Sequence, residues 1–419
     1  MTKGNNSVVI TGLGVVSPIG NNVPVFWRNL LAGYCGVNRL HRFKSTYGTE
    51  HIGADVKQFD PLNYMEKKTA RDTDIVTQFA LAATKEALDD AHLQHPFLQP
   101  TRVGIVIGTS LGGVNALWEE FCQFVERGPD RTSPKLMTKW IPNMTAYQVA
   151  HQFGIRGPSL TISTACASSN NAIGLAKKMI NNGEADIIIT GGTESLFIPI
   201  IQAGLTANRA LSKMIHEPQR ASRPFDLRRD GMVMGEGCGI AVLESESHAR
   251  KRGAKIYCEL AGYGSNGEGH HPTAPSPDGS GEVQAMRQAL EDAQIDPQEI
   301  DYVNAHGTST PLGDEIETEA IKQVFGEHAY RMSVSSIKGA TGHLLGASGA
   351  VELIATVKAM EEGIVPPTLN YEVRDPKCDL DYVPKVPRPQ SVRAALSNSF
   401  GFGGENASII LRTMDARHL

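Results

Sequence analysis

The alternation of apolar and polar residues follows the same plan twice along the chain. In the first half, an apolar strand over residues 8–10 ends in two closely spaced glycines, and an amphipathic helix follows. In the second half, a strand over residues 256–261 ends in the same way, again before an amphipathic helix. The apolar residues at helical spacing are Ile75, Phe79, Ala83, Ala87 and Ala91 in the first helix, and Val283, Met286, Leu290 and Ala293 in the second.

Each half then continues with a buried strand, a strand that runs directly into a helix, and two final strands. The predicted positions are 103–107 and 301–305 for the buried strands, 160–163 and 333–337 for the strands before helices, and 186–190, 239–243, 394–398 and 407–411 for the final strands. The helices after the junctions should end at Gly183 and Gly363, because glycine is common just beyond a helix C-terminus. The repeated order predicts an internal duplication.

Strands that alternate with helices predict an α/β fold with mostly parallel sheets covered by helices. Two such units would pack as five layers, α-β-α-β-α. At 419 residues the chain is longer than one typical core supports. We therefore expect an N-terminal half over residues 1–254 and a C-terminal half over residues 255–419.

Four stretches do not follow the repeat. Residues of about 20–70, 110–150 and 195–235 are insertions, which are expected to build a pocket rim and a dimer contact. The segment 366–393 is rich in proline and mixed charge, and it is expected to be a surface excursion.

Composition narrows the class of protein. A net charge of −5 argues against nucleic acid as the main partner. The six cysteines are scattered without metal-ligand spacing, which indicates a reduced, cytoplasmic protein. The first residues lack the apolar run of a signal peptide, and no window approaches the ~18 apolar residues of a membrane span.

Cys166 is the first candidate for chemistry. A free cysteine is most often a buried, inert side chain, and that interpretation suits the other five. Cys166 differs because it directly precedes a helix, whose N-terminal dipole favours the thiolate. Residues 163–171 around it are all small or polar, which indicates a side chain that a second molecule can reach.

His306 and His343 are the second and third candidates. Each follows an apolar strand of the second half and lies among small residues. A thiol with two imidazoles, in that order, suggests thioester chemistry through a covalent intermediate. Lys338 and Glu352 flank His343 in the sequence; besides forming an ordinary ion pair, they are expected to orient the histidines.

Two glycine-rich segments and one histidine pair are further candidates for a binding site, and only one of the three is supported. Residues 262–267 match GxGxxG, but the prolines that follow exclude the helix a dinucleotide site needs. His270 and His271 beside Glu268 indicate a loop, since adjacent residues rarely converge on one metal ion. In residues 397–404, glycines around two aromatics favour a backbone loop that offers an N–H to an oxyanion, with Phe402 as a movable gate.

With these motifs together, the chain resembles the β-ketoacyl-acyl-carrier-protein synthases of the elongating type, most closely their synthase II group. The similarity spans essentially the whole length. It is carried by residues 11–17, the Cys166 segment, residues 191–194, 223–226, 231–237 and 304–310, Lys338 with residues 341–343, and residues 398–404.

The resemblance implies the thiolase-like fold and a role for each candidate. Cys166 would take an acyl group from acyl carrier protein. His306 and His343 would contact the malonyl thioester carbonyl and stabilise the enolate formed on loss of CO2, which attacks the acyl-cysteine. The N–H groups of Cys166 and Phe402 would form the oxyanion hole.

The resemblance also implies substrate contacts and partners. The substrate-binding residues would be Thr273, Thr308 and Thr310 along the phosphopantetheine arm, Leu111 at the pocket floor, and Phe400. The basic patch for the acidic carrier protein would contain Lys68, Arg71, Arg131 and Arg209. A homodimer is implied, whereas no metal, redox cofactor or ATP is.

Five positions depart from the family pattern. They are Ser169 and Asn170 after the nucleophile, Glu405 where threonine is frequent, and Asp72 and Asp130 where some relatives are basic. The changes leave the chemistry intact, but they leave carrier-protein affinity and chain-length preference open.

Related activities remain as alternatives. A thiolase needs a second catalytic cysteine where this chain has His343, and the initiating synthase pairs its cysteine with histidine and asparagine. A ketosynthase of a type II polyketide pathway shares the Cys-His-His set. A non-catalytic partner subunit that sets chain length would lack the nucleophile, so Cys166 argues against it.

Overall fold

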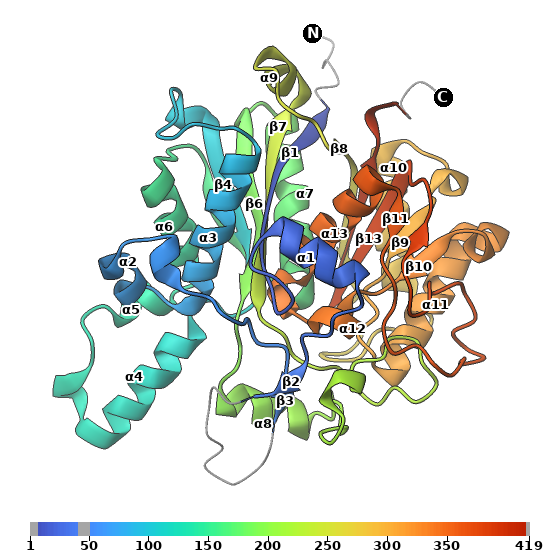
Figure 1. The fold of residues 1–419 in the computed structure, drawn as a ribbon, viewed down its shortest axis with the longest axis horizontal. Helices are drawn as coiled ribbons and strands as arrows, with labels where there is room; N and C mark the ends of the chain where they lie inside the picture. The colour runs from blue at the N-terminus through green and yellow to red at the C-terminus, as the bar shows by residue number, and fades with distance from the viewer. Residues whose placement is uncertain (1–6, 41–50, 416–419) are drawn as a thin grey trace.

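The computed structural model describes residues 7–40 and 51–415. Ten strands form one sheet in the order β10-β9-β13-β14-β8-β1-β7-β6-β4-β5 (Figure 1). The strands of the first half are β1 (Val8–Val16), β4 (Val103–Gly108), β5 (Ser159–Ile162), β6 (Ile187–Glu194) and β7 (Gly237–Ser245). Those of the second half are β8 (Cys258–Gly267), β9 (Tyr302–Asn304), β10 (Ser333–Ser335), β13 (Ala394–Gly401) and β14 (Glu405–Arg412).

The sheet consists of two five-stranded halves with the same internal order. In the first half β1 neighbours β7, then β6, β4 and β5; in the second half β8 neighbours β14, then β13, β9 and β10. Four strands of each half run in one direction, and only β7 or β14 runs against them. The halves join through two residue pairs between β1 and β8, Val9 with Glu259 and Ile10 with Cys258. The predicted duplication is confirmed.

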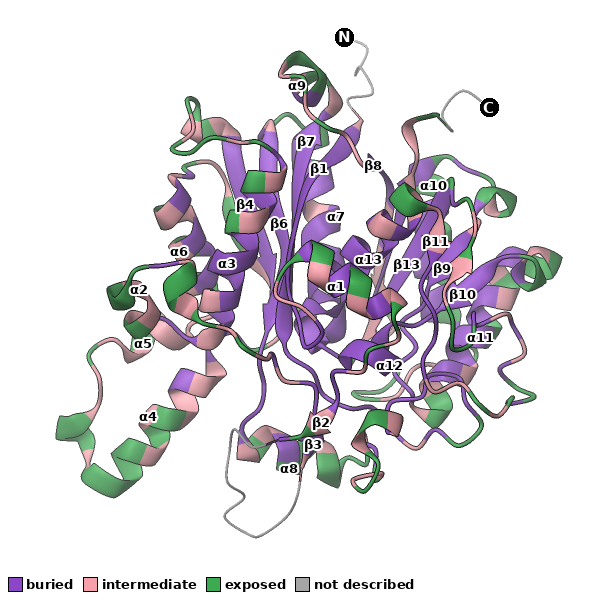
Figure 2. Cartoon of the chain, in the orientation of Figure 1, coloured by how far each residue is buried: buried purple, intermediate pink, exposed green. Residues whose placement is uncertain are grey.

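Helices cover both faces of each half and complete the five predicted layers. The outer layer of the first half contains α3 (Ile75–Asp90) and α6 (Asn143–Phe153), and that of the second half contains α10 (Ser280–Ala293) and α11 (Pro311–Phe325). Between the halves lie α7 (Ser168–Asn181) and α13 (Ser348–Glu362), which pack against each other and against strands of both halves. Figure 2 shows that this central layer is almost wholly buried.

Small residues allow the central helices to approach the strands closely. The core between the halves combines Ala172, Ile173 and Ala176 of α7 with Ala350 and Ile354 of α13. At the end of β4, a Cβ added to Gly108 would lie 2.5 Å from the backbone of Ser168. The first residue of α7 is therefore held directly against the strand end.

The insertions contribute shorter elements around the carboxyl ends of the strands. Their helices are α1 (Val23–Leu31), α2 (Lys67–Asp72), α4 (Val114–Arg127), α5 (Leu136–Trp140) and α8 (Pro199–Ala207), and their strands β2 (Asn38–Arg39) and β3 (Ile52–Gly53). Helix α4 projects from the body of the protein (Figure 1). Residues 41–50 of the first insertion lie outside the described part of the chain. Within the described residues, no helix is both long and apolar enough to cross a membrane.

The segment 366–393 is not the surface excursion that its prolines and charges predict. Leu369, Cys378, Leu380 and Tyr382 within it are buried. The Tyr382 ring stacks on Phe225 with ring centroids 4.0 Å apart. The segment therefore contributes to the core, because most of its apolar residues are buried, although Val386 is exposed.

Candidate active site

Cys166 lies in a tight turn between a strand and a central helix. Strand β5 ends at Ile162, a 3₁₀ turn spans Ala165–Ala167, and α7 begins at Ser168. Ala165 has a φ of 49°, an uncommon conformation for a residue with a side chain. The Ser168 hydroxyl donates to the Ala165 carbonyl (2.7 Å) and accepts from the Thr164 N–H (2.9 Å), which holds the turn.

His306 and His343 come from the second half. His306 follows β9, and its own N–H and that of Gly307 donate to the Glu317 carboxylate over 2.8 and 2.7 Å. His343 follows a short helix, α12 (Lys338–Thr341), and precedes a 3₁₀ turn over Leu345–Ala347. Loops after strands thus bring all three side chains together, although they come from opposite halves.

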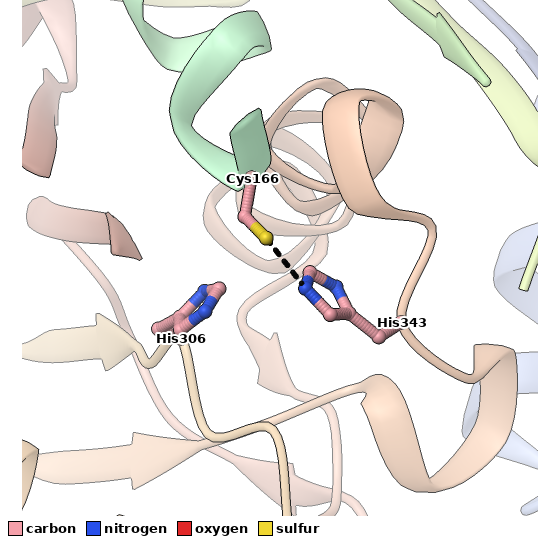
Figure 3. Close-up of side chains that lie close together, drawn as sticks. All are labelled: Cys166, His306 and His343. Atoms are coloured by element: carbon pink, nitrogen blue, oxygen red, sulfur yellow. Dashed lines mark hydrogen bonds between the residues drawn. The ribbon is translucent and has the colours of Figure 1, made fainter. Parts of the chain in front are cut away.

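The three side chains converge on one point (Figure 3). His343 Nε2 lies 3.0 Å from Cys166 Sγ. The two imidazole rings lie nearly perpendicular, with centroids 5.2 Å apart. The Phe400 ring borders His306 on another side at 5.8 Å. Neither histidine has more than a tenth of its surface exposed.

The contacts of His343 fix which ring nitrogen carries its proton. The Leu345 N–H donates to Nδ1 over 3.3 Å, and the Ser348 hydroxyl lies 2.9 Å from the same atom. A backbone N–H can only donate, so Nδ1 is the acceptor and the proton resides on Nε2. The Nε2–H group therefore points into the site as a donor. In His306, Nδ1 has no hydrogen-bond partner.

Burial keeps both imidazoles neutral. Desolvation lowers the pKa of His306 and of His343 well below the usual value, and the positive charge of Lys338 lowers both further. Lys338 itself forms an ion pair with Glu352, and both side chains are buried. The expected placement of Lys338 and Glu352 next to the histidines thus agrees with their contacts.

The pKa of the thiol contradicts the expectation drawn from the helix dipole. Burial raises the pKa of Cys166 to about 12, although the Lys338 charge and the Phe402 N–H lower it in part. Desolvation of the thiolate outweighs the helix N-terminus because the whole side chain is enclosed. Cys166 is therefore a protonated thiol in the resting site.

A cavity of about 730 Å³ includes this centre, and its lining combines apolar with polar residues. The apolar lining includes Leu111, Leu196, Ile200, Leu205 and Met232. Thr273, Thr308, Thr310, Phe400 and Phe402 line the same cavity. Four of the five apolar residues belong to the insertion over 195–235, α8 included, so this insertion builds the pocket rim as expected.

The predicted polar contacts, the three threonines, all belong to the cavity lining. The Thr308 and Thr310 hydroxyls are 3.1 Å apart and both face the cavity, as Thr273 does. The turn after β13 lies against the nucleophile: a Cβ added to Gly401 would be 3.1 Å from the Cys166 N atom. Phe402 is 38% exposed and lines the cavity, so its side chain is only loosely held.

The four basic residues expected to bind carrier protein come from three separate parts of the chain. Lys68 and Arg71 lie exposed on α2, Arg131 lies exposed beyond α4, and Arg209 borders the cavity. Arg71 pairs with Asp72 over 3.0 Å. Asp72 pairs in addition with Lys135, so this departure from the family pattern adds an internal partner to the patch.

Of the other departures, Asp130 is exposed beyond α4, and the remaining three lie next to the turns that build the site. Ser169 donates to the carbonyl of Gly346, and the Asn170 amide faces the Ser397 and Ala407 carbonyls of β13 and β14. Glu405 begins β14, next to the turn that carries Phe402. Ser169 and Asn170 therefore connect α7 with the second half of the protein.

Three contributing residues escaped the sequence analysis. Ser348 orients His343, Glu317 holds the loop of His306, and Glu194 bonds the loop that carries Leu111. Ser348 had a local signal, because it begins the helix after His343. The other two act on loops that no local spacing connects to them.

The same three side chains also offer a metal-ligand set. Their ligand atoms lie within 4.8 Å of one another, and thiolate with imidazole suits zinc. A metal ion there would take the sulfur lone pairs that a nucleophile needs. That the active protein holds no metal here stays a prediction. Inhibition of the protein by added Zn²⁺ would support it.

Comparison with known proteins gives matches over the whole chain. A family model for the N-terminal domain of beta-ketoacyl synthase matches residues 5–249, and one for the C-terminal domain matches residues 257–372. The 3-oxoacyl-[acyl-carrier-protein] synthase 2 of Synechocystis sp. is 45% identical, over 97% of each chain. The protein of the same name from Coxiella burnetii is 43% identical, over 96% of this chain and 98% of its own.

Solved structures agree with the sequence matches. A beta-ketoacyl synthase from Burkholderia phymatum aligns with a TM-score of 0.90 at 36% identity, over 98% of this chain and 100% of its own. A chain of the AntDE:AntF complex, a type II polyketide acyl-carrier protein with its ketosynthase, aligns with a TM-score of 0.90 at 35% identity and the same coverage.

Proposed function

The chain belongs to the beta-ketoacyl synthase family, and from that premise we propose that Cys166, His306 and His343 are its catalytic residues. The protein is a 3-oxoacyl-[acyl-carrier-protein] synthase, an acyltransferase of fatty acid elongation. It condenses malonyl-acyl carrier protein with an acyl chain held on Cys166, and it releases CO2. The convergence of one thiol and two neutral imidazoles at a common point carries the assignment.

In the first step the acyl group moves from carrier protein to Cys166. Sulfur attacks the thioester carbonyl, the bond to the pantetheine sulfur breaks, and the thiol proton ends on that leaving sulfur. The oxyanion of the intermediate accepts hydrogen bonds from the Cys166 and Phe402 N–H groups. Each such donor stabilises the transition state by ~2.7–4 kcal/mol. A thiol pKa of about 12 requires the proton to leave as the sulfur–carbon bond forms.

In the second step malonyl-carrier protein binds beside the threonines of the cavity. The bond to its carboxylate breaks, CO2 leaves, and the electron pair passes into an enolate whose oxygen accepts bonds from His306 and His343. Neutral imidazoles suit this task because they donate without giving up a proton. The enolate carbon attacks the acyl thioester on Cys166, and the released sulfur takes up a proton from water.

We assign the supporting roles on the same basis. Thr273, Thr308 and Thr310 hold the phosphopantetheine arm, with Phe402 as the gate beside them. Leu111 and Phe400 contact the acyl chain and the malonyl group. Loss of CO2 drives the condensation, so it requires no redox cofactor, ATP or metal.

Acyl carrier protein is the proposed partner, docked by Lys68, Arg71, Arg131 and Arg209. Support comes from the AntDE:AntF structure, whose ketosynthase is bound to such a protein. We also propose a homodimer. The strand β5 lies at the sheet edge with Leu160 exposed, and α4 exposes Phe121, Phe124 and Val125. Both features suit a subunit contact.

The remaining assignments concern location and division of the chain. All six cysteines are free of disulfide bonds, which fits a cytoplasmic enzyme. Residues 1–254 form the half that carries the nucleophile, and residues 255–419 form the half that carries both catalytic histidines.

The test is elongation in a defined mixture. The protein is incubated with dodecanoyl-carrier protein and malonyl-carrier protein, and the carrier-bound products are identified by mass spectrometry. We expect one 3-oxoacyl product that is two carbons longer, and none from a folded Cys166→Ala variant. A folded wild-type protein that gives no elongated product would contradict the proposal. Repeated condensation on one chain would instead assign the protein to polyketide synthesis.

A further inference from the structure

Glu194 is a buried carboxylate that the condensation does not use. It is the last residue of β6, and its side chain has no exposed surface. It accepts the Ser110 N–H over 2.6 Å, the Ser110 hydroxyl, and the Thr109 hydroxyl over 3.3 Å. The Leu111 N–H is directed at the same carboxylate. One side chain thus binds three consecutive residues of a loop that is 84 positions away in sequence.

The loop that Glu194 binds forms part of the substrate cavity. Ser110 and Leu111 line it, and Leu111 is 41% exposed although it faces a pocket. Apart from Glu194, the loop is held by the Ser163 hydroxyl, which donates to the Ser110 carbonyl (3.0 Å), and by the Thr109 N–H, which donates to Ile162 (3.0 Å). The position of Leu111 therefore depends on the backbone of its own loop.

Glu194 is also enclosed from the opposite side. A Cβ added to Gly346 would lie 2.5 Å from Glu194 Oε2 and 2.7 Å from the Ser110 N atom. Gly346 belongs to the 3₁₀ turn that follows His343. The backbone of this turn therefore packs directly against the point where the carboxylate meets the loop.

We propose that Glu194 is a positioning residue that fixes Leu111 in the apolar lining of the cavity and so sets which acyl lengths Cys166 accepts. The inference rests on the proposed function, because it concerns the acyl chain of that reaction. Leu111 limits the length of the cavity only while its loop is held against β6. When the loop is held less firmly, Leu111 can move out of the cavity, and kcat/KM for longer acyl chains rises.

The test compares acyl lengths in the Glu194→Gln variant. Glutamine keeps the volume but turns one acceptor oxygen into an N–H donor that faces the loop N–H groups. We expect the ratio of kcat/KM for hexadecanoyl over octanoyl substrate to rise about tenfold, the scale of discrimination by a hydrophobic pocket. Leu111→Ala should raise the ratio as well. Adding Glu194→Gln to Leu111→Ala should change it no further, since Glu194 acts through that side chain.

Two further variants separate positioning from general damage. Glu244 is a buried carboxylate near the opposite end of the neighbouring strand β7, bonded to Arg252 and His248. Glu244→Gln should lower stability and leave the ratio unchanged. Ser110→Ala removes one bond to Glu194 and should raise the ratio to a lesser degree, which keeps the test decisive if Glu194→Gln does not fold.

An equal loss of kcat/KM for both acyl lengths in Glu194→Gln, or an unchanged ratio in Ser110→Ala, would overturn the inference. Failure of the proposed function looks different, because the wild-type protein would then elongate neither substrate.

Discussion

Two turns of the protein occupy the same place in the duplicated fold and do different work. Ala165–Ala167 precedes α7 in the first half, and Leu345–Ala347 precedes α13 in the second. Their first residues, Ala165 and Leu345, have φ values of 49° and 51°. The central residue is Cys166 in one turn and Gly346 in the other. The fold therefore provides two equivalent positions, and the first of them carries a thiol, the proposed nucleophile.

The second turn carries no reactive side chain and instead supports neighbouring parts of the site. Gly346 leaves the space in which the Glu194 carboxylate meets the cavity loop. The serines that begin the two helices differ in the same way: Ser168 bonds only its own turn, whereas Ser348 orients His343. His343 itself lies three residues before Gly346, so it does not occupy the position equivalent to Cys166. We propose that this asymmetry assigns the acyl group to one half and the malonyl group to the other.

The largest effect should come from the first turn. Cys166→Ala removes the sulfur that lies 3.0 Å from His343 Nε2, and condensation should fall by a factor on the order of 10⁴ or more, as for other covalent nucleophiles. Elongation of dodecanoyl-carrier protein measures it. Cys35→Ala, at a half-buried cysteine away from the cavity, serves as the control. A Cys166→Ala protein that still elongates would show that the nucleophile lies elsewhere.

The pH dependence of Cys166 alkylation gives the next largest effect. With a thiol pKa raised to about 12, the thiolate fraction grows about tenfold for each pH unit below that value. The rate of reaction with iodoacetamide, followed by intact mass, should therefore rise throughout from pH 7 to pH 10. A plateau near neutral pH would mean that the helix N-terminus, and not burial, controls the thiol.

The second turn can be disturbed without touching the nucleophile. In Gly346→Ala the new methyl group would lie 2.5 Å from Glu194 Oε2, so the loop or the turn must shift, at a cost of ~1–3 kcal/mol. Urea unfolding measures this loss of stability. Gly267→Ala, where nothing lies within 4 Å of the added Cβ, is the matched control. Equal stability of both variants would contradict the close packing around Gly346.

The smallest effect concerns the serine that begins α13. Ser348→Ala removes one hydrogen bond to His343 Nδ1, worth about 1 kcal/mol or a fivefold change in rate. CO2 release from malonyl-carrier protein should slow by that factor, while acylation of Cys166 continues. Ser168→Ala, at the equivalent position, should instead affect acylation. The same loss in both assays for both variants would remove the proposed division between the halves.

The sequence predicted the duplicated fold because strand, helix and glycine recur in one order. It also predicted that Cys166, His306 and His343 come together, since each follows an apolar strand among small residues. It also predicted that the strand over 333–337 runs directly into the second central helix, whereas the short helix α12 and the loop of His343 lie between β10 and α13. Gly346, the residue at the position equivalent to Cys166, has no side chain, so the sequence pattern does not identify it.

Other properties depended on contacts between distant segments. The thiol pKa follows from enclosure by both halves, which the residues next to Cys166 do not report. Glu194 bonds a loop 84 residues away, and the four basic residues proposed to bind carrier protein come from three separate parts of the chain. The sequence suggested a surface location for the segment 366–393, because its prolines and charged residues outnumber the apolar residues that face the core.

The most direct measurement of the central claim is a pair of assays on His343→Ala. Acylation of Cys166 by dodecanoyl-carrier protein is followed by intact mass, and release of labelled CO2 from malonyl-carrier protein is followed separately. The account predicts an acyl adduct as in the wild type and CO2 release reduced by a factor of ~10²–10³, the effect of losing one such donor. Decarboxylation at the wild-type rate in a folded His343→Ala protein would contradict it.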